Sequence, residues 1–180
     1  MSRWLLTKLL DYGKTQIGDV EMDFAYHLRD VAPGRLWRFS MIKVVEGGRK
    51  FTPADVYHAA GMAAAMVEDC GPCVQIHVNL ALKDKVSGDV LRALASRQFD
   101  KVPADVALGF RYGEAIAQGV MADEMRDQIR AKWGEQGLIE LAFAIATARF
   151  YPALKRGMGY AHTCERVVVE DRVTATAKAA

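Results

Sequence analysis

The chain has 180 residues, of which 51% are apolar and 26% charged, an ordinary composition for a soluble globular protein. Its length suits a single domain that buries roughly 70% of its unfolded surface. The formal net charge of +2, without any run of like charges, argues against a nucleic-acid partner.

The segment MSRWLLTKLLDYG has only a short apolar group, Trp4–Leu6, and therefore predicts no signal peptide. The longest apolar run, Ala59–Val67, is far shorter than the ~20 residues that cross a bilayer. We expect a cytoplasmic protein without a membrane partner. Cytosolic thiols stay reduced, so a close cysteine pair is more often catalytic or metal-binding than structural.

Residues 1–50 give the weakest signals and are expected to be an N-terminal extension. Within them, Trp37–Val45 has the β-branched content of a strand but no hairpin partner. The first clear helix signal is Thr52 as the cap, with Pro53 as the first helical residue. The predicted helix continues through ADVYHAAGMAAAMVED, residues 54–69.

Gly71 and Pro72 interrupt this helix. A second helix is predicted to begin there and to run through VQIHVNLALK, because proline is tolerated in a first turn. Three further helices are then predicted, over Asp89–Arg97 after the cap Ser87, over residues 104–119 after Pro103, and over Ala122–Trp133.

The strongest helix signal covers residues 137–160 and is apolar nearly all round up to Tyr151, which predicts a central buried helix. Pro152 is expected to kink or divide it, and the helix dipole accounts for Glu140 in its first turn. The segment from residue 165 onward, which includes ERVVVEDRV, is expected to be an extended tail. The predicted fold class is all-α.

The segment EDCGPCVQIH brings two thiols and an imidazole together at Cys70, Cys73 and His77. Steps of three and four residues place all three on one face of a helix. The helix N-terminus and the imidazole one turn beyond Cys73 both favour a thiolate. This grouping predicts a redox or metal site.

Two helical residues three apart have Cα atoms about 5 Å apart, a separation that a disulfide bridges. If peroxide oxidises one thiolate to a sulfenic acid, the other can resolve it. We expect Cys73 to be the base-assisted thiol and Cys70 its partner, with His77 as proton acceptor. The reverse order stays open, because the cap position favours Cys70 as the more acidic and exposed thiol.

The string CGPC also occurs in thioredoxins, whose site follows a buried strand. Here the preceding residues, AAGMAAAMVED, favour helix, so we do not expect a thioredoxin fold. The pattern C-x-x-C-x-x-x-H, followed by LGFRYGEAIAQG and GLIELAFAIATARFYPALKRGMG, resembles the AhpD-like family of the carboxymuconolactone decarboxylase superfamily. The resemblance covers roughly residues 54–160.

The resemblance implies an all-helical fold with the cysteine pair at a helix N-terminus, and alkylhydroperoxidase activity without a bound cofactor. It implies a hydroperoxide substrate, a dithiol-bearing protein as reductant (a lipoyl-bearing one in the best-known members), and a homo-oligomer, a trimer or hexamer. Cys70, Cys73 and His77 match the family's catalytic positions. The decarboxylases of the superfamily lack the cysteine pair, so that chemistry is not expected.

The chain departs from the family at one position. The family usually has a glutamate about twelve residues before the first cysteine, where this chain has His58. A histidine can serve as a base near neutral pH, and Glu68, the nearest carboxylate in sequence, can substitute if its helix turns it inward. Both are candidate relay residues.

Three alternatives remain open at this point. The cysteine pair can serve a dithiol–disulfide oxidoreductase or redox sensor without strong peroxide activity. It can bind zinc together with His77 and a fourth ligand from His58, His162 or Cys164. It can also be a packing feature of a non-enzymatic helical assembly.

Overall fold

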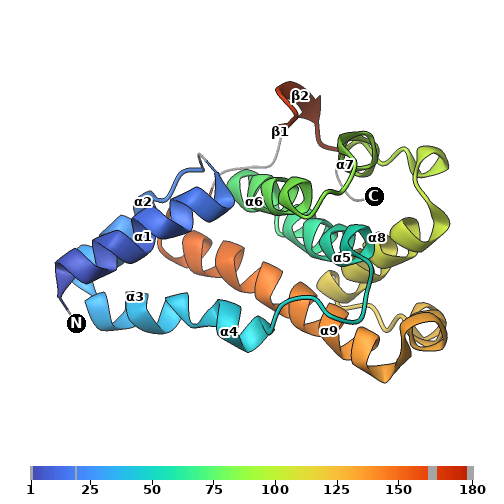
Figure 1. Ribbon diagram of the computed structural model, residues 1–180, viewed down its shortest axis with the longest axis horizontal. Coiled ribbons are helices and arrows are strands. Elements are labelled where there is room, and N and C mark those ends of the chain that lie inside the picture. The colour runs from blue at the N-terminus through green and yellow to red at the C-terminus, as the bar shows by residue number, and fades with distance from the viewer. Residues whose placement is uncertain (1, 19, 162–165, 178–180) are drawn as a thin grey trace.

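The computed structural model describes residues 2–18, 20–161 and 166–177. Apart from one small hairpin, this part of the chain forms helices, which confirms the all-α prediction (Figure 1). The elements are α1 (Arg3–Ile17), α2 (Asp23–Val31), α3 (Pro33–Ser40), α4 (Ile42–Glu46), α5 (Ala54–Val67), α6 (Gly71–Lys83), α7 (Gly88–Ala95), a 3₁₀ turn (Phe99–Lys101), α8 (Ala104–Ala117), α9 (Asp123–Gly157), β1 (Arg166–Val169) and β2 (Arg172–Ala175).

The main core is built around α5, which packs most extensively on α8 and also on α6 and α9. Small residues make this close packing possible: α5 is rich in alanine and buried along most of its length. On α8, a Cβ at Gly113 would collide with the carbonyl oxygen of Ala60. The α5 helix is therefore held rigidly in the centre, and it carries His58 and Gly61.

The α9 helix contains the helix predicted over residues 137–160, but the prediction that this helix is the central buried one is wrong. Ile139, Phe143 and Phe150 are exposed on one side of it, and α5 lies at the centre of the core instead. At Gly134 its backbone has φ 72° and ψ 179°, which separates two helical segments near the predicted boundary after Trp133. The helix continues through Pro152 to Gly157, so the proline does not divide it. By length and composition α9 is the one described helix that could cross a membrane, and half of its most apolar stretch is buried within the protein.

The N-terminal helices correct one prediction. Residues 37–45 form the end of α3 and most of α4, not a strand. A short apolar run does not by itself distinguish helix from strand, and here Pro33 in the first turn starts a helix. Leu36 is fully buried in a second core cluster, where α1–α3 pack on residues such as Leu154 near the end of α9.

The C-terminal segment also differs from prediction, because β1 and β2 form an antiparallel hairpin in which Val169 pairs with Arg172. The two turn residues, Glu170 and Asp171, both have positive φ, as a two-residue type I′ turn requires. Asn-Gly is the usual sequence signal for such a turn, so the sequence Glu-Asp did not predict a hairpin here. Gln75 of α6 anchors β1, since its side-chain amide exchanges two hydrogen bonds with the backbone of Val168.

The starts of the helices around the cysteine motif agree only partly with prediction. The α6 helix begins at Gly71 with Pro72 in its first turn, as predicted. The α5 helix begins at Ala54, and Pro53 rather than Thr52 occupies the cap position. The Thr52 side chain makes no cap hydrogen bond, because its hydroxyl donates to Glu140 of α9 instead.

Candidate functional site

The two cysteines of the motif are joined by a disulfide with a Cα–Cα separation of 5.2 Å, which agrees with the spacing argument. Cys70 is the N-cap of α6, and Cys73 lies in its first turn. Cys70 is completely buried, whereas Cys73 is 4% exposed and lines a cavity. The expectation that Cys70 is the more exposed sulfur is therefore wrong, because Cys70 lies within the main hydrophobic core.

Two cavities meet at His77, and Lys43 and Leu80 also contribute to both. The smaller, about 160 Å³, contains Cys73 and has mostly apolar walls from α1, α2, α3, α6 and α9. The larger, about 400 Å³, contains His58 and Asp84 and has more polar walls. His77 therefore borders both the cavity that contains Cys73 and the cavity that contains His58.

His77 of α6 lies against α5. Its ring packs so closely on Gly61 that a Cβ at that position would lie 2.6 Å from the ring carbon Cε1. Burial, with smaller effects from Lys43 and His58, lowers the pKa of His77 to about 3. The imidazole is therefore neutral at physiological pH and has a nitrogen lone pair for a proton.

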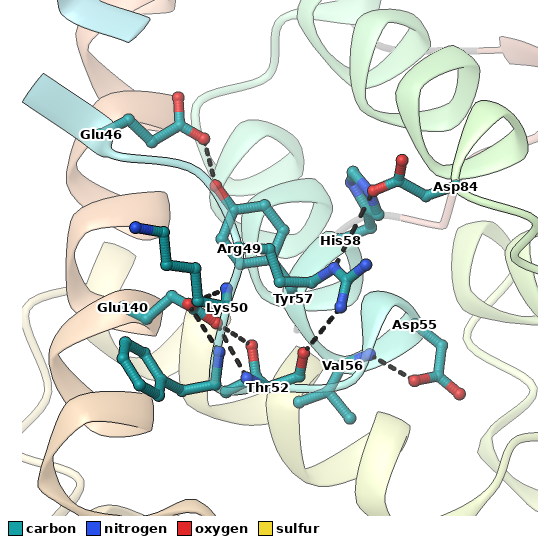
Figure 2. Close-up of polar contacts among 11 residues, drawn as sticks. Glu46, Arg49, Lys50, Thr52, Asp55, Val56, Tyr57, His58, Asp84 and Glu140 are labelled. Carbon is teal, nitrogen blue, oxygen red and sulfur yellow. Dashed lines mark hydrogen bonds and ion pairs between the residues drawn. The ribbon is translucent and has the colours of Figure 1, made fainter. Parts of the chain in front are cut away.

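His58 pairs with an aspartate that the sequence analysis did not identify. Its Nε2 lies 2.8 Å from Oδ2 of Asp84, at the end of α6 (Figure 2). An ionised carboxylate only accepts hydrogen bonds, so Nε2 carries the proton and Nδ1 keeps its lone pair. This Nδ1 is buried and has no hydrogen-bond partner in the described part of the chain. Burial lowers the pKa of His58, and Asp84 only partly opposes this effect.

Asp84 also attracts Arg49, whose Nε lies 4.0 Å from the same carboxylate oxygen. Figure 2 shows the Arg49 guanidinium, the Asp84 carboxylate and the His58 ring side by side. The side chain of Asp84 is 44% exposed. The cluster therefore connects a buried imidazole to solvent.

Glu68 has a different set of partners from those expected of a relay residue. Its carboxylate forms ion pairs with Arg149 at 2.9 Å and Arg156 at 3.2 Å, both on α9. These contacts fix the end of α5, and hence the turn that leads into Cys70, against α9. Glu68 is a structural anchor in this arrangement.

Glu140 organises the loop that precedes α5. Its carboxylate accepts hydrogen bonds from the backbone N–H groups of Lys50, Phe51 and Thr52 and from the Thr52 hydroxyl (Figure 2). Burial alone would raise the pKa of Glu140, but these hydrogen bonds lower it overall. The helix dipole is therefore not the reason for Glu140 at this position. Its carboxylate connects α9 to the loop before α5, the helix that carries His58.

No group of three or more metal-ligating side chains occurs among residues 2–18, 20–161 and 166–177. His162 and Cys164, candidates for a fourth zinc ligand, lie outside the described residues.

Two residues of the cavities were not found from the sequence. Asp84 lies seven positions after His77 and continues the face of α6 that carries Cys73 and His77, so helical spacing gave a usable signal. Lys155, 3% exposed, lines the apolar cavity from α9. Nothing in the sequence connects it to the cysteine motif, because the two meet only through the packing of α6 on α9.

Comparison of the chain with protein-family models, with curated proteins and with solved structures found no match.

Proposed function

We propose that this protein is a thiol-dependent hydroperoxidase of the AhpD-like type. The observation that supports this most directly is the common cavity of Cys73 and a neutral His77, with Cys70 positioned behind Cys73 to form a disulfide. A peroxide that enters this cavity meets a sulfur and a proton acceptor. The second sulfur needs no backbone movement to resolve the product.

The proposed reaction starts from the reduced pair. His77 accepts the Cys73 proton, and the thiolate attacks the terminal oxygen of a hydroperoxide ROOH. The O–O bond breaks, Cys73 becomes a sulfenic acid, and His77 returns the proton to the departing alkoxide to give ROH. The Cys70 thiol then attacks the sulfenic sulfur, which forms the disulfide and releases water.

The low pKa of His77 belongs to the disulfide state and is compatible with this role. In the reduced protein a thiolate at Cys73 favours the protonated imidazole, because an opposite charge nearby stabilises it. The ion pair therefore forms when the peroxide needs a nucleophile and is lost when the disulfide closes.

We also propose that His58 and Asp84 take the position of the family's usual glutamate. His58 and His77 line the same polar cavity, and the Asp84 contact leaves His58 Nδ1 able to accept a proton. A water molecule in that cavity would connect the two imidazoles. Asp84 acts through His58 and is therefore a positioning residue.

The cycle is completed by a dithiol, which reduces the Cys70–Cys73 disulfide and becomes a disulfide itself. We propose a protein-borne dithiol, because the nearly complete burial of both sulfurs favours a reductant that reaches inward on a flexible arm. A lipoyl group meets this requirement.

A homo-oligomer is part of the same proposal. The outer face of α9 exposes Ile139, Phe143 and Phe150, and α4 beside it exposes Val44 and Val45. Large exposed apolar side chains gathered on neighbouring helices commonly mark an interface. A second copy of the chain would bury it.

Titration of free thiols after addition of one equivalent of hydroperoxide tests the activity, with Cys164→Ser as the background. The reduced protein should lose two thiols and consume one peroxide. Cys70→Ser should stop at a Cys73 sulfenic acid, and Cys73→Ser should not react. Unchanged peroxide consumption by Cys73→Ser would contradict the mechanism.

The disulfide itself favours a second candidate function, a dithiol–disulfide oxidoreductase without strong peroxide activity. Stopped-flow oxidation separates the two. If the thiols exchange with a dithiol partner but react with hydroperoxide no faster than free cysteine, the second function holds and the first fails.

A further inference from the structure

The apolar cavity beside Cys73 is lined by two cations that the proposed reaction does not use, Lys43 and Lys155. Lys155 lines this cavity from the last turns of α9 and is 3% exposed. Its ammonium lies 5.3 Å from the centre of the Phe24 ring. The Lys155 side chain as a whole is buried, and its ammonium donates no hydrogen bond to another residue in the described part of the chain.

The surroundings of Lys155 do not fully compensate its burial. Glu21 and Asp23 attract the ammonium, yet desolvation is the larger effect and lowers the pKa of Lys155 overall. Glu21 is exposed and therefore lies toward the solvent side of the cavity. Lys155 forms no ion pair within 4 Å in the described part of the chain, and the carboxylate of a ligand in the cavity can pair with its ammonium directly.

The other walls indicate the remainder of that ligand. They come mainly from apolar side chains of five helices, including Ile17, Phe39, Ile76 and Tyr151. The second lysine at the cavity, Lys43, is exposed and pairs with Glu46 at 2.6 Å. Glu21 is likewise a charged residue on the solvent side of the cavity, and Lys155 is the buried cation among its apolar walls. A single ammonium in such surroundings suits a singly charged head group with a hydrocarbon chain better than a phosphate.

The size of the cavity limits the chain. An apolar cavity of about 150 Å³ holds a benzene molecule, so the volume of about 160 Å³ accommodates roughly six carbons. A longer chain would need space outside this cavity, and the polar cavity of about 400 Å³ on the other side of His77 is the neighbouring space.

We propose that Lys155 binds the carboxylate of an alkyl hydroperoxide and that the apolar walls guide its peroxide group to Cys73. This inference rests on the proposed function, since it names the substrate class for the same site. The carboxylate pairs with the ammonium and takes no part in the reaction.

The test compares a carboxylate-bearing alkyl hydroperoxide with its methyl ester, by kcat/KM for oxidation of the reduced wild-type protein. We expect the acid to be preferred by about 10- to 100-fold, the range for a hydrogen bond to a charged group. In Lys155→Met the acid-to-ester ratio should approach one, and Lys155→Arg should restore part of it. The control Lys132→Met, at an exposed lysine on the same helix that pairs with Asp105, should keep the wild-type ratio.

A wild-type ratio near one would overturn the inference even if Lys155→Met fails to fold, while the proposed function would stand. Binding of octanoate to the oxidised wild-type protein provides a readout that needs no turnover. If neither hydroperoxide reacts but octanoate binds and octanol does not, the proposed function fails and the carboxylate site stands. If octanoate binds no better than octanol, the site is refuted.

Discussion

The imidazole of His77 lies directly against Gly61, with no room for a side chain between them. A Cβ at position 61 would lie 2.6 Å from Cε1 and 2.9 Å from Nδ1 of the ring. Glycine at this position on α5 therefore sets how closely α6 approaches and where the His77 ring can lie. The two residues are 16 positions apart in sequence, and neither fixes the geometry alone.

Replacing Gly61 with alanine should displace His77 from its place in the cavity that it shares with Cys73. We expect slower hydroperoxide-dependent thiol loss and a free energy of unfolding lower by about 1–3 kcal/mol, the usual cost of overpacking. Stopped-flow thiol oxidation and urea unfolding measure the two effects. Gly13→Ala is the matched control, because Gly13 is also helical but a Cβ there meets nothing within 4 Å. An oxidation rate equal to wild type in Gly61→Ala would show that the ring position is unimportant.

The low pKa of His77 predicts a pH-dependent stability. The folded pKa, about 3, lies below the ordinary value of 6.5, so the unfolded chain takes up a proton first as the pH falls. The contribution of neutral His77 to the free energy of unfolding is therefore fully present above pH 6.5, and it declines as the pH falls from that value to about 3. Urea unfolding of the oxidised protein at pH 7 and pH 5 should show a smaller difference for His77→Asn than for wild type. His27→Asn, at an exposed histidine, should retain the wild-type difference.

Glu140 predicts a separate loss of stability in acid. Its pKa is lowered in the folded state from 4.5, so its contribution is present above that pH and disappears as the pH falls through the lower folded value. At pH 7, Glu140→Gln should reduce the free energy of unfolding by about 1–3 kcal/mol, because buried N–H donors lose a charged acceptor. Glu135→Gln, whose side chain is 60% exposed, is the control and should change little. Equal stability of Glu140→Gln and wild type at pH 7 would exclude this anchoring role.

Part of the fold and of the candidate site could be predicted from the sequence, and part could not. Local rules were sufficient for the start of α6 and for the spacing of Cys70, Cys73 and His77, since helix periodicity and the position of Pro72 determine both. They failed for residues 37–45 because a short apolar run fits either secondary structure until tertiary contacts decide. Glu140 and Lys155 were misinterpreted or missed, because their partners lie on elements that meet only in the folded chain.

The exposed apolar face of α9 predicts self-association. Phe143 is 43% exposed, with Ile139 on the preceding turn of the same face. Placing a charge there should weaken a homo-oligomer, because burying an unpaired carboxylate is costly. Sedimentation of Phe143→Glu should therefore show smaller species than wild type, whereas Val173→Glu, also at an exposed apolar residue but in the hairpin, should leave the distribution unchanged. A monomeric wild-type protein at assay concentration would refute the interface.

The contact between His58 and Asp84 leads to the prediction most specific to this chain. Asp84→Asn removes the charge that holds the Nε2 proton, and because Asp84 partly opposes the lowering of the His58 pKa, that pKa should fall further. If the pair carries protons for His77, thiol oxidation should slow by about tenfold or more, as for loss of an acid–base group. The pH profile of the rate should change shape as well as height. Asp105→Asn is the matched control, since Asp105 is 48% exposed and pairs with a lysine. A purely structural role would lower the unfolding free energy of Asp84→Asn but leave the pH profile unaltered, and that result would remove His58 and Asp84 from the mechanism.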